Sequence, residues 1–486
     1  MIGRFEHARG LTVNPRYAWA LIITLVAAFI SFFFSLQFGV FTLLFAAVAW
    51  WVWEYPEEGF LLFLVLMPIL PMLKITQTIG TFSLIKDVII ITLFMRMFFI
   101  PLLAKKLEYR RNILWAPIVA LVIWSTISAL QADSLVLGIL RLRDIVLYIL
   151  LFFGVLYLRH DKKTLQQRLG WVLATFIVTL SLGAWQWFFA QDSAVLRFEP
   201  LTQNWIPRIS GILAHPSIFG EYLITVQTLL VAIAVSVRSM KIRAGVLATV
   251  ILSLIVTYAT YSRGVWLGLA AALGVGGLLY LLHLAAGRLS RKKVASLATG
   301  FGVGGLLLGI LLVTATPAGP LLRSIVDPTY GSNEERLEFL VRLIAPMTYA
   351  EAVFGRGLGD VLEQNFRETD LGVYDIATGA SRSVQLTKDQ TLVDNQYLKT
   401  FIEMGVVGLV LYGWLYWRVG SAAVRIARTQ KPLIGLWAGA FLTAFLVQAL
   451  IIDIWDIFPT NAIFWIVAAV TSQALLTAET DGIMSE

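Results

Sequence analysis

Cysteine is absent from the 486 residues of this sequence, which excludes disulfide bonds, thiol catalysis and cysteine-ligated metal. Histidine is scarce, with four residues, and charged residues make up 14% of the chain, against about 25% in a soluble globular domain. Low-complexity tracts and repeats of solenoid period are also missing. The sequence is therefore not that of an ordinary soluble enzyme, a disulfide-rich secreted domain or a repeat scaffold.

What the sequence contains instead is a series of long apolar runs. Hydrophobic residues make up 58% of the chain and the mean hydropathy is +0.79. Most runs approach the roughly 20 residues that a helix needs to cross a bilayer. We expect membrane spans at residues 17–36, 38–53, 59–73, 84–104, 113–131, 137–158, 170–190, 212–237, 244–260, 264–283, 296–316, 398–418, 433–452 and 456–476. The second and third runs are short and form either two spans or one re-entrant pair, so the sequence predicts an all-α polytopic membrane protein with about 12–14 helices.

Lysine and arginine cluster in the short loops between these spans. The clusters occur at residues 4–16, 105–111, 159–168, 238–243, 288–293 and 418–431. With fourteen spans they all fall on one side, which the positive-inside rule makes the cytoplasm. Both termini are then cytoplasmic, and the first apolar run is retained because no small-residue cleavage site follows it. The net charge of +8 is accordingly a topology signal and does not indicate nucleic-acid binding.

One polar stretch, residues 317–397, interrupts the apolar pattern and falls on the outer side, in the periplasm or outside the cell. It divides the chain into residues 1–316 with eleven helices, the outer loop, and residues 398–486 with three helices. Within the loop, residues 336–354 are amphipathic and too short to span, so we expect short helical structure along the membrane interface. The sequence GRGLGD at 355–360 predicts a flexible turn, and its glycine pattern is weak support for phosphate binding because no strand precedes it.

Two arginines stand at the outer ends of spans, where the positive-inside rule disfavours them. Arg208 precedes the span at 212–237, and Arg263 lies in a very short turn between two apolar runs. Arg263 either extends to lipid headgroups or binds an anion. Because a guanidinium is a planar fork of donors that matches a phosphate, two of them on one face suit a pyrophosphate such as that of a polyprenyl lipid carrier.

Three further basic residues are candidates on the outer side. Arg141 and Arg143 open the span at 137–158, where they either contact substrate or pair with Asp144. His215 is the single histidine expected on the outer side, and it either contacts substrate or serves at a helix start. One histidine without partner ligands does not predict a zinc centre, so we expect no metal site.

The segment that leads into the span at 398–418 is also polar. Asp394 is either the N-cap of that helix or a carboxylate that orients or deprotonates an acceptor hydroxyl. Near two arginines such a carboxylate is a weak base that takes the proton late, as the bond to the leaving group breaks. Asn395 and Tyr397 are predicted to contact substrate beside it.

Four segments in this order resemble the O-antigen ligase and O-antigen polymerase superfamily. They are RISGILAHPSIFGEYL, TYSRGVWLGLA, NEERLEFLVRLIAPMTYAEAVFGRGLGD and VDNQYLKTFIEMGVVGLVLYGWLY, which begin at residues 208, 260, 333 and 393. Each motif is loose by itself, and their order, sidedness and spacing carry the resemblance. Members of the superfamily are bacterial inner-membrane proteins with about a dozen helices and a large periplasmic loop late in the chain. The resemblance therefore implies a GT-C-like membrane fold.

The resemblance implies a metal-independent, inverting glycosyltransferase without a cofactor. Its donor is an undecaprenyl-pyrophosphate-linked oligosaccharide, and its acceptor is a glycan, lipid or protein, such as lipid A-core in ligases or a second lipid-linked repeat unit in polymerases. Arg208 and Arg263 resemble the arginines that bind the donor pyrophosphate, and Arg336 resembles the arginine that opens the loop helix. Asp394 stands where ligases usually have a histidine, which favours a polymerase. Membrane lipids and envelope-assembly proteins are the other expected partners.

Two functions of other classes remain alternatives to a glycosyltransferase. A secondary transporter of an anion or a lipid-linked sugar predicts charged or helix-breaking residues near span midpoints and two related halves. The predicted spans are nearly free of charge in their middles and show no matched pair of interrupted helices. A non-catalytic scaffold for envelope assembly gives no reason for an arginine in the short turn at Arg263.

Overall fold

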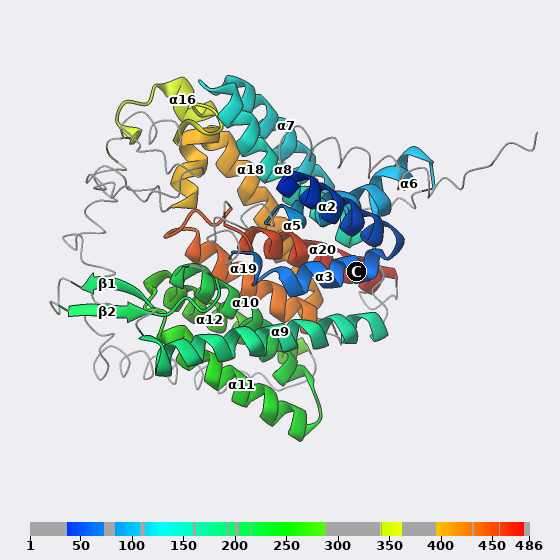
Figure 1. Ribbon diagram of the computed structural model, residues 1–486, viewed down its shortest axis with the longest axis vertical. Coiled ribbons are helices and arrows are strands. Elements are labelled where there is room, and N and C mark those ends of the chain that lie inside the picture. The colour runs from blue at the N-terminus through cyan, green and yellow to red at the C-terminus, as the bar shows by residue number, and fades with distance from the viewer. Residues whose placement is uncertain are drawn as a thin grey trace, which may run out of the picture.

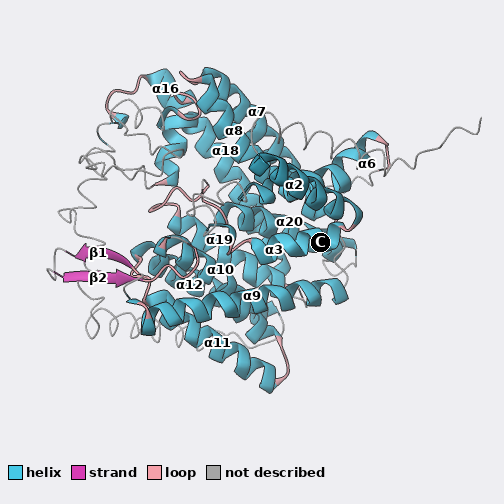
Figure 2. Ribbon diagram, in the orientation of Figure 1, coloured by secondary structure: helices cyan, strands magenta, loops and turns pink. Residues whose placement is uncertain are grey.

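The structure is a computed structural model. It describes residues 36–71, 83–106, 112–158, 162–191, 194–199, 204–213, 215–286, 341, 343–361, 395–429, 432–455 and 457–480. Apart from one two-stranded hairpin, the described elements are helices, which confirms the all-α polytopic membrane fold (Figures 1 and 2). The predicted span 296–316, nearly all of span 17–36, and the candidate residues Arg336 and Asp394 lie outside the described residues.

Every predicted apolar run within the described part of the chain contains a helix. The helices are α2 (Leu36–Glu54), α3 (Pro56–Leu66), α5 (Ile85–Phe94), which continues through η2 (Met95–Phe99) into α6 (Ile100–Leu103), α7 (Trp115–Gln131), α8 (Leu135–Leu156), α9 (Lys162–Phe189), α10 (Pro216–Ser236), α11 (Met240–Tyr258), α12 (Arg263–Ala286), α16 (Tyr349–Phe354), α18 (Gln396–Ala427), α19 (Leu433–Gln448) and α20 (Thr460–Thr480). Six of those described are long and apolar enough to cross a membrane, namely α9, α10, α11, α12, α18 and α20. At about 1.5 Å per residue, the 11 residues of α3 are too short to cross the hydrocarbon core as a helix.

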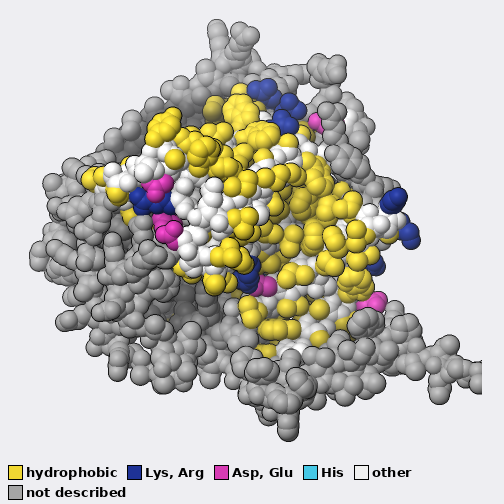
Figure 3. Space-filling model, turned by 90° about the horizontal axis from the view of Figure 1, so that it is seen from above, with side chains coloured by type: hydrophobic (Ala, Val, Ile, Leu, Met, Phe, Trp, Pro, Cys, Tyr) yellow, Lys and Arg dark blue, Asp and Glu magenta, His cyan; other side chains and the backbone are white. Residues whose placement is uncertain are grey.

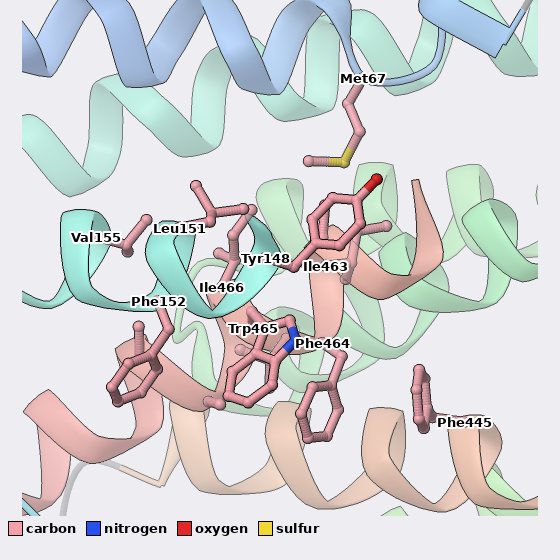
Figure 4. Close-up of a cluster of buried hydrophobic side chains, with 14 of the residues drawn as sticks. Met67, Tyr148, Leu151, Phe152, Val155, Phe445, Ile463, Phe464, Trp465 and Ile466 are labelled. Atoms are coloured by element: carbon pink, nitrogen blue, oxygen red, sulfur yellow. The ribbon is translucent and has the colours of Figure 1, made fainter. Parts of the chain in front are cut away.

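Aromatic side chains from several helices form the centre of the core. Phe152 of α8, Phe445 of α19 and Trp465 of α20 are almost completely buried, and Figure 4 shows them in one cluster. The rings of Phe445 and Phe464 lie 5.0 Å apart between centroids, a distance typical of favourable aromatic pairs. This cluster joins α8, α19 and α20, and α19 in turn packs against α12 and α18, which carry polar residues described below.

The surface of the helices is apolar where it faces outward. Ile123 of α7, Val136 of α8 and Ile177 of α9 are each more than half exposed. Most of the described side chains seen in Figure 3 are hydrophobic, and the charged ones among them form a few small groups. Apolar side chains in this pattern are suited to contact with lipid, as a multi-pass membrane protein requires.

The helix bundle has two ends, and Arg208 and Arg263 lie at one of them. At this end the hairpin of β1 (Val195–Glu199) and β2 (Asn204–Arg208) leads toward α10, with Val195 paired to Arg208. The start of α18 bonds the end of α19 there, through Gln396 N–H and the Ala449 carbonyl at 2.8 Å. At the opposite end, Arg418 Nε near the end of α18 donates to the Ile113 carbonyl before α7 at 3.1 Å.

Candidate functional site

The candidate site is built around the turn between α11 and α12, residues 259–262. Tyr261 has a φ of 46°, which lets the chain reverse within a few residues. The rings of Tyr258 and Trp266 stack across the turn with centroids 5.5 Å apart. Trp266 Nε1 also donates to the Thr257 carbonyl at 3.3 Å. The turn is thus held by its own flanking helices, and α12 begins immediately after it at Arg263.

Arg208 and Arg263 both lie against this turn. Arg208 ends β2, and its Nε donates to the Thr260 carbonyl at 3.0 Å. The next residue adds a backbone bond from Ile209 N–H to the Ala259 carbonyl at 3.2 Å. Each arginine is only 8% exposed, which places both inside the protein and not along its lipid-facing surface. The structure therefore brings two buried guanidinium groups to one turn.

The start of α10 joins the same place. Ser217 Oγ lies 3.2 Å from Ser262 Oγ of the turn. His215 is the N-cap of α10, and its Nδ1 accepts from the Ser217 backbone N–H at 3.2 Å. Desolvation and the nearby positive charge of Arg208 lower the pKa of His215. The structural role left open for His215 is thus present, and it lies close enough to Arg208 to sense that charge.

These features make the surroundings of the α10 N-terminus electropositive. Two arginines lie beside the N-terminus of a 21-residue helix, where the helix dipole favours an anion. Arg263 opens a second helix of 24 residues at the same turn. Such an arrangement can bind a multiply charged anion and stabilise negative charge that develops on it.

The segment 449–459 connects this turn to the start of α18. A side chain placed at Gly264 would meet Ile451 of this segment at 3.2 Å. On its other side, Trp455 N–H donates to Gln396 Oε1 at 3.0 Å. Asn395 is the N-cap of α18, and its Oδ1 accepts from the Leu398 N–H at 3.0 Å. Asn395 therefore has the N-cap role that was left open for Asp394. Only the segment 449–459 separates it from α12, the helix that begins at Arg263.

The remaining sequence-predicted residues have partners elsewhere. Tyr397 Oη donates to the Leu446 carbonyl of α19 at 2.9 Å. Arg143 of α8, with 45% of its side chain exposed, pairs with Asp144 at 3.1 Å and with Asp87 of α5. Arg141, at 5% exposed, pairs through its Nε with Glu403 of α18 at 3.3 Å, a partner that the sequence did not suggest.

Several buried charged residues were not among the sequence-predicted candidates. Glu221 of α10 accepts a hydrogen bond from Thr460 Oγ1 at 2.6 Å, and Lys399 of α18 pairs with Asp453 at 3.2 Å. Glu221, Lys399 and the Glu403 partner of Arg141 are at most 3% exposed. In α18 a signal was available, because Gln396, Lys399 and Glu403 follow the spacing of one helix face within an apolar span.

The glycine-rich turn at 355–360 is docked on α18. Arg356 N–H donates to the Ile402 carbonyl at 2.8 Å, and Gly357 N–H donates to the Glu403 carbonyl at 3.1 Å. Gly359 N–H donates to Glu403 Oε1 at 3.1 Å. The expected flexible turn is instead held by α18, and the backbone donors that a phosphate would require already bond the protein.

Comparison with known proteins gives one family. Residues 248–413 match the family model of O-antigen ligase. The matched segment includes the second half of α11, the turn at 259–262, Arg263, the docked glycine turn and the first half of α18, while Arg208 and His215 precede it. No curated protein matches the chain. The match covers about a third of the chain and supports the resemblance to the O-antigen ligase and polymerase superfamily. The six long apolar helices agree with a multi-pass membrane protein.

Proposed function

We propose that this protein is a membrane glycosyltransferase that moves a glycan from an undecaprenyl-pyrophosphate donor to an acceptor hydroxyl. The observation that carries this proposal is the meeting of Arg208 and Arg263, both buried, at one turn beside the N-terminus of α10. The donor pyrophosphate is the anion that these groups suit, because each guanidinium offers paired donors to phosphate oxygens.

In the proposed reaction the acceptor oxygen attacks the anomeric carbon of the donor sugar. The bond from that carbon to the pyrophosphate oxygen breaks, and the electron pair leaves with the pyrophosphate, whose growing charge Arg208 and Arg263 stabilise. Asp394 orients the acceptor hydroxyl and takes its proton late in the step. An in-line displacement inverts the anomeric configuration. Both substrates are held at one membrane surface, which adds proximity to the electrostatic contribution.

A polymerase is preferred to a lipid A-core ligase. The reason is Asp394, which stands where ligases usually carry a histidine. A polymerase would use a second lipid-linked repeat unit as acceptor, and a ligase would use a separate glycan, lipid or protein. The buried charges Glu221, Lys399 and Glu403 lie within about the first two turns of their helices and not at midpoints, which supports a transferase over a transporter.

We also propose the cellular arrangement. Residues 1–316 and 398–486 form the helical membrane part of a bacterial cytoplasmic-membrane protein, and residues 317–397 form its outer loop. Both termini face the cytoplasm, and the two arginines face the periplasm or the cell exterior. Envelope-assembly proteins and membrane lipids are the expected partners besides donor and acceptor.

The decisive experiment is glycan transfer by the purified protein in lipid. The reaction receives an undecaprenyl-pyrophosphate oligosaccharide, and EDTA is included because the proposed chemistry needs no metal. Lipid-linked ladders without another acceptor would identify a polymerase, and transfer only to an added acceptor would identify a ligase. Arg263→Ala and Arg208→Ala should each reduce the rate by about 100-fold or more, the usual effect of removing a group that stabilises developing charge.

A matched control is Arg243→Ala. Arg243 also bonds a backbone carbonyl, that of Val237 at 2.8 Å, but it lies in the first turn of α11, at the other end of this helix from the turn at 259–262. This variant should transfer glycan at the wild-type rate. Wild-type transfer by both Arg208→Ala and Arg263→Ala would overturn the pyrophosphate site.

A further inference from the structure

The carboxylate of Glu403 is a buried junction between three parts of the chain. It accepts hydrogen bonds from Arg141 Nε of α8 at 3.3 Å and from the backbone N–H of Gly359 at 3.1 Å. Glu403 is 2% exposed and Arg141 is 5% exposed. The side chain of one residue in α18 therefore holds both a neighbouring helix and the outer segment 343–361.

The backbone around Glu403 extends this junction to α7. The Glu403 carbonyl accepts from Ser128 Oγ at 2.7 Å, and the Met404 carbonyl accepts from Trp124 Nε1 at 3.0 Å. Gly355 packs directly on the backbone of residues 403–404. Helices α7, α8, α16 and α18 accordingly lie together at one end of the view in Figure 1.

A break in α18 separates the first residues of this helix from the rest, so their position depends on the contacts of Glu403. Gly405 has a φ of 67° and a ψ of −168°, so it interrupts the helix between its first nine residues and the rest. Residues 396–404 form a short rod with its own attachments. Gln396 attaches the rod to the segment 449–459 beside Gly264, and Glu403 attaches its other end. The two side chains are seven residues apart and therefore lie on the same helix face.

The energetics of a buried ion pair indicate that Arg141 and Glu403 orient the elements they join and contribute little to stability. Moving an arginine and a glutamate out of water costs several kcal/mol per ion, so a buried pair adds little net stability. Such pairs are best explained where they select one arrangement of the elements they join. Here the two elements are the outer segment 343–361 and residues 396–404 of α18. The N-cap of that helix, Asn395, directly follows Asp394 in the sequence.

We propose that Glu403 is a positioning residue for glycan transfer. Its carboxylate, shared between Arg141 and Gly359, fixes the rotation of residues 396–404 and so sets where the N-terminal end of α18, at its cap Asn395, lies relative to Arg208 and Arg263. Arg141 then acts through Glu403 and not as a ligand of the donor. This inference rests on the proposed glycosyltransferase function.

The kinetic test uses Glu403→Asp and Glu403→Gln in the transfer assay with purified protein in lipid. Glu403→Asp keeps the charge but withdraws the carboxylate by one methylene, and a misplacement of about 1 Å can cost 100-fold in rate. We expect kcat to fall at least tenfold in both variants with the donor KM within about twofold of wild type. Asp144→Asn, an exposed carboxylate on α8, is the control and should leave both constants unchanged. An unchanged kcat, or a raised donor KM as the main effect, would overturn the proposal.

A second measurement does not depend on activity. Because the chain has no cysteine, spin labels can be attached only at engineered positions. Tyr349→Cys on α16 and Trp417→Cys on α18 are both strongly exposed and report the distance between the outer segment and α18. The distance distribution should be narrow with Glu403 and should broaden or shift in Glu403→Gln. An unchanged distribution would overturn the positioning role. Loss of transfer in Arg263→Ala beside normal Glu403 variants would leave the proposed function intact and reject this inference alone.

Discussion

At the scale of single residues, the chemistry of His215 depends on its protonation. Its Nδ1 accepts a hydrogen bond from the Ser217 N–H, which is possible only when that nitrogen carries no proton. Desolvation, and then the positive charge of Arg208, lower the pKa of the ring below its ordinary value of 6.5. The folded protein therefore favours the neutral, capping form of His215.

This shift predicts a pH dependence of stability. The unfolded chain binds the proton of His215 more tightly, so the stabilising effect of the neutral ring is fully present above about pH 6.5 and is lost as the pH falls through the lowered pKa. His215→Asn keeps a capping side chain that does not titrate. Between about pH 7.5 and pH 5 the melting temperature of the wild type should fall further than that of the variant. Equal decreases would mean that His215 does not act as a neutral cap.

Single residues also show what the sequence can and cannot predict. Arg208 and Arg263 are conspicuous because the positive-inside rule disfavours arginine at outer span ends. The partner of Arg141 is not predictable in this way, since Glu403 is 262 residues away along the chain and only the packing of the helices brings it near. Sequence neighbours suggested Asp144 as a partner of both arginines, and it does pair with Arg143.

At the scale of elements, the break in α18 at Gly405 is the feature most sensitive to substitution. A Cβ atom at Gly405 would clash with the Val353 carbonyl of α16, and its φ of 67° disfavours any other residue. Gly405→Ala should therefore destabilise the docked outer segment by at least about 1–2 kcal/mol. Limited proteolysis near residues 343–361 and the melting temperature would both report the loss.

The same helix provides the control for this prediction. Gly413 of α18 has nothing within 4 Å of the position where a Cβ would lie. Gly413→Ala should leave stability unchanged or raise it by up to about 1 kcal/mol, because alanine is the better helix former. If both variants behave alike, the close contact between Gly405 and α16 does not contribute to the docking.

Helices were predicted correctly where the length of an apolar run alone decides the structure. Helices such as α10 and α20 follow from runs of about 20 apolar residues, because a backbone in lipid must satisfy its own hydrogen bonds. The polar face of α18 at Gln396, Lys399 and Glu403 escaped notice because averaging over an apolar run hides its few charges. The hairpin at 195–208 was missed because each strand has only five residues and the second contains Pro207, which weakens a strand signal.

At the scale of the whole molecule, the ends of the helices separate two kinds of charge. Buried charged residues lie near the starts of α10, α12 and α18. Arg208 and Arg263 lie at the turn 259–262, and Glu403, in the first turns of α18, pairs with Arg141. Exposed basic residues such as Lys106 follow α6, and Arg418 near the end of α18 contacts the segment before α7. The positive-inside rule predicts that the second end faces the cytoplasm, and this prediction would place the candidate site on the outer side.

This sidedness can be tested directly because the chain has no cysteine of its own. Gln191→Cys lies in an exposed position at the end of α9 beside the hairpin, and Lys106→Cys lies in an exposed position after α6. A membrane-impermeant maleimide should label the first variant in cells whose cytoplasmic membrane is intact, and the second only after permeabilisation. The reverse pattern would place Arg208 and Arg263 in the cytoplasm. A polyprenyl-linked glycan presented on the outer leaflet would then be out of their reach, and the proposed reaction could not take place at this site.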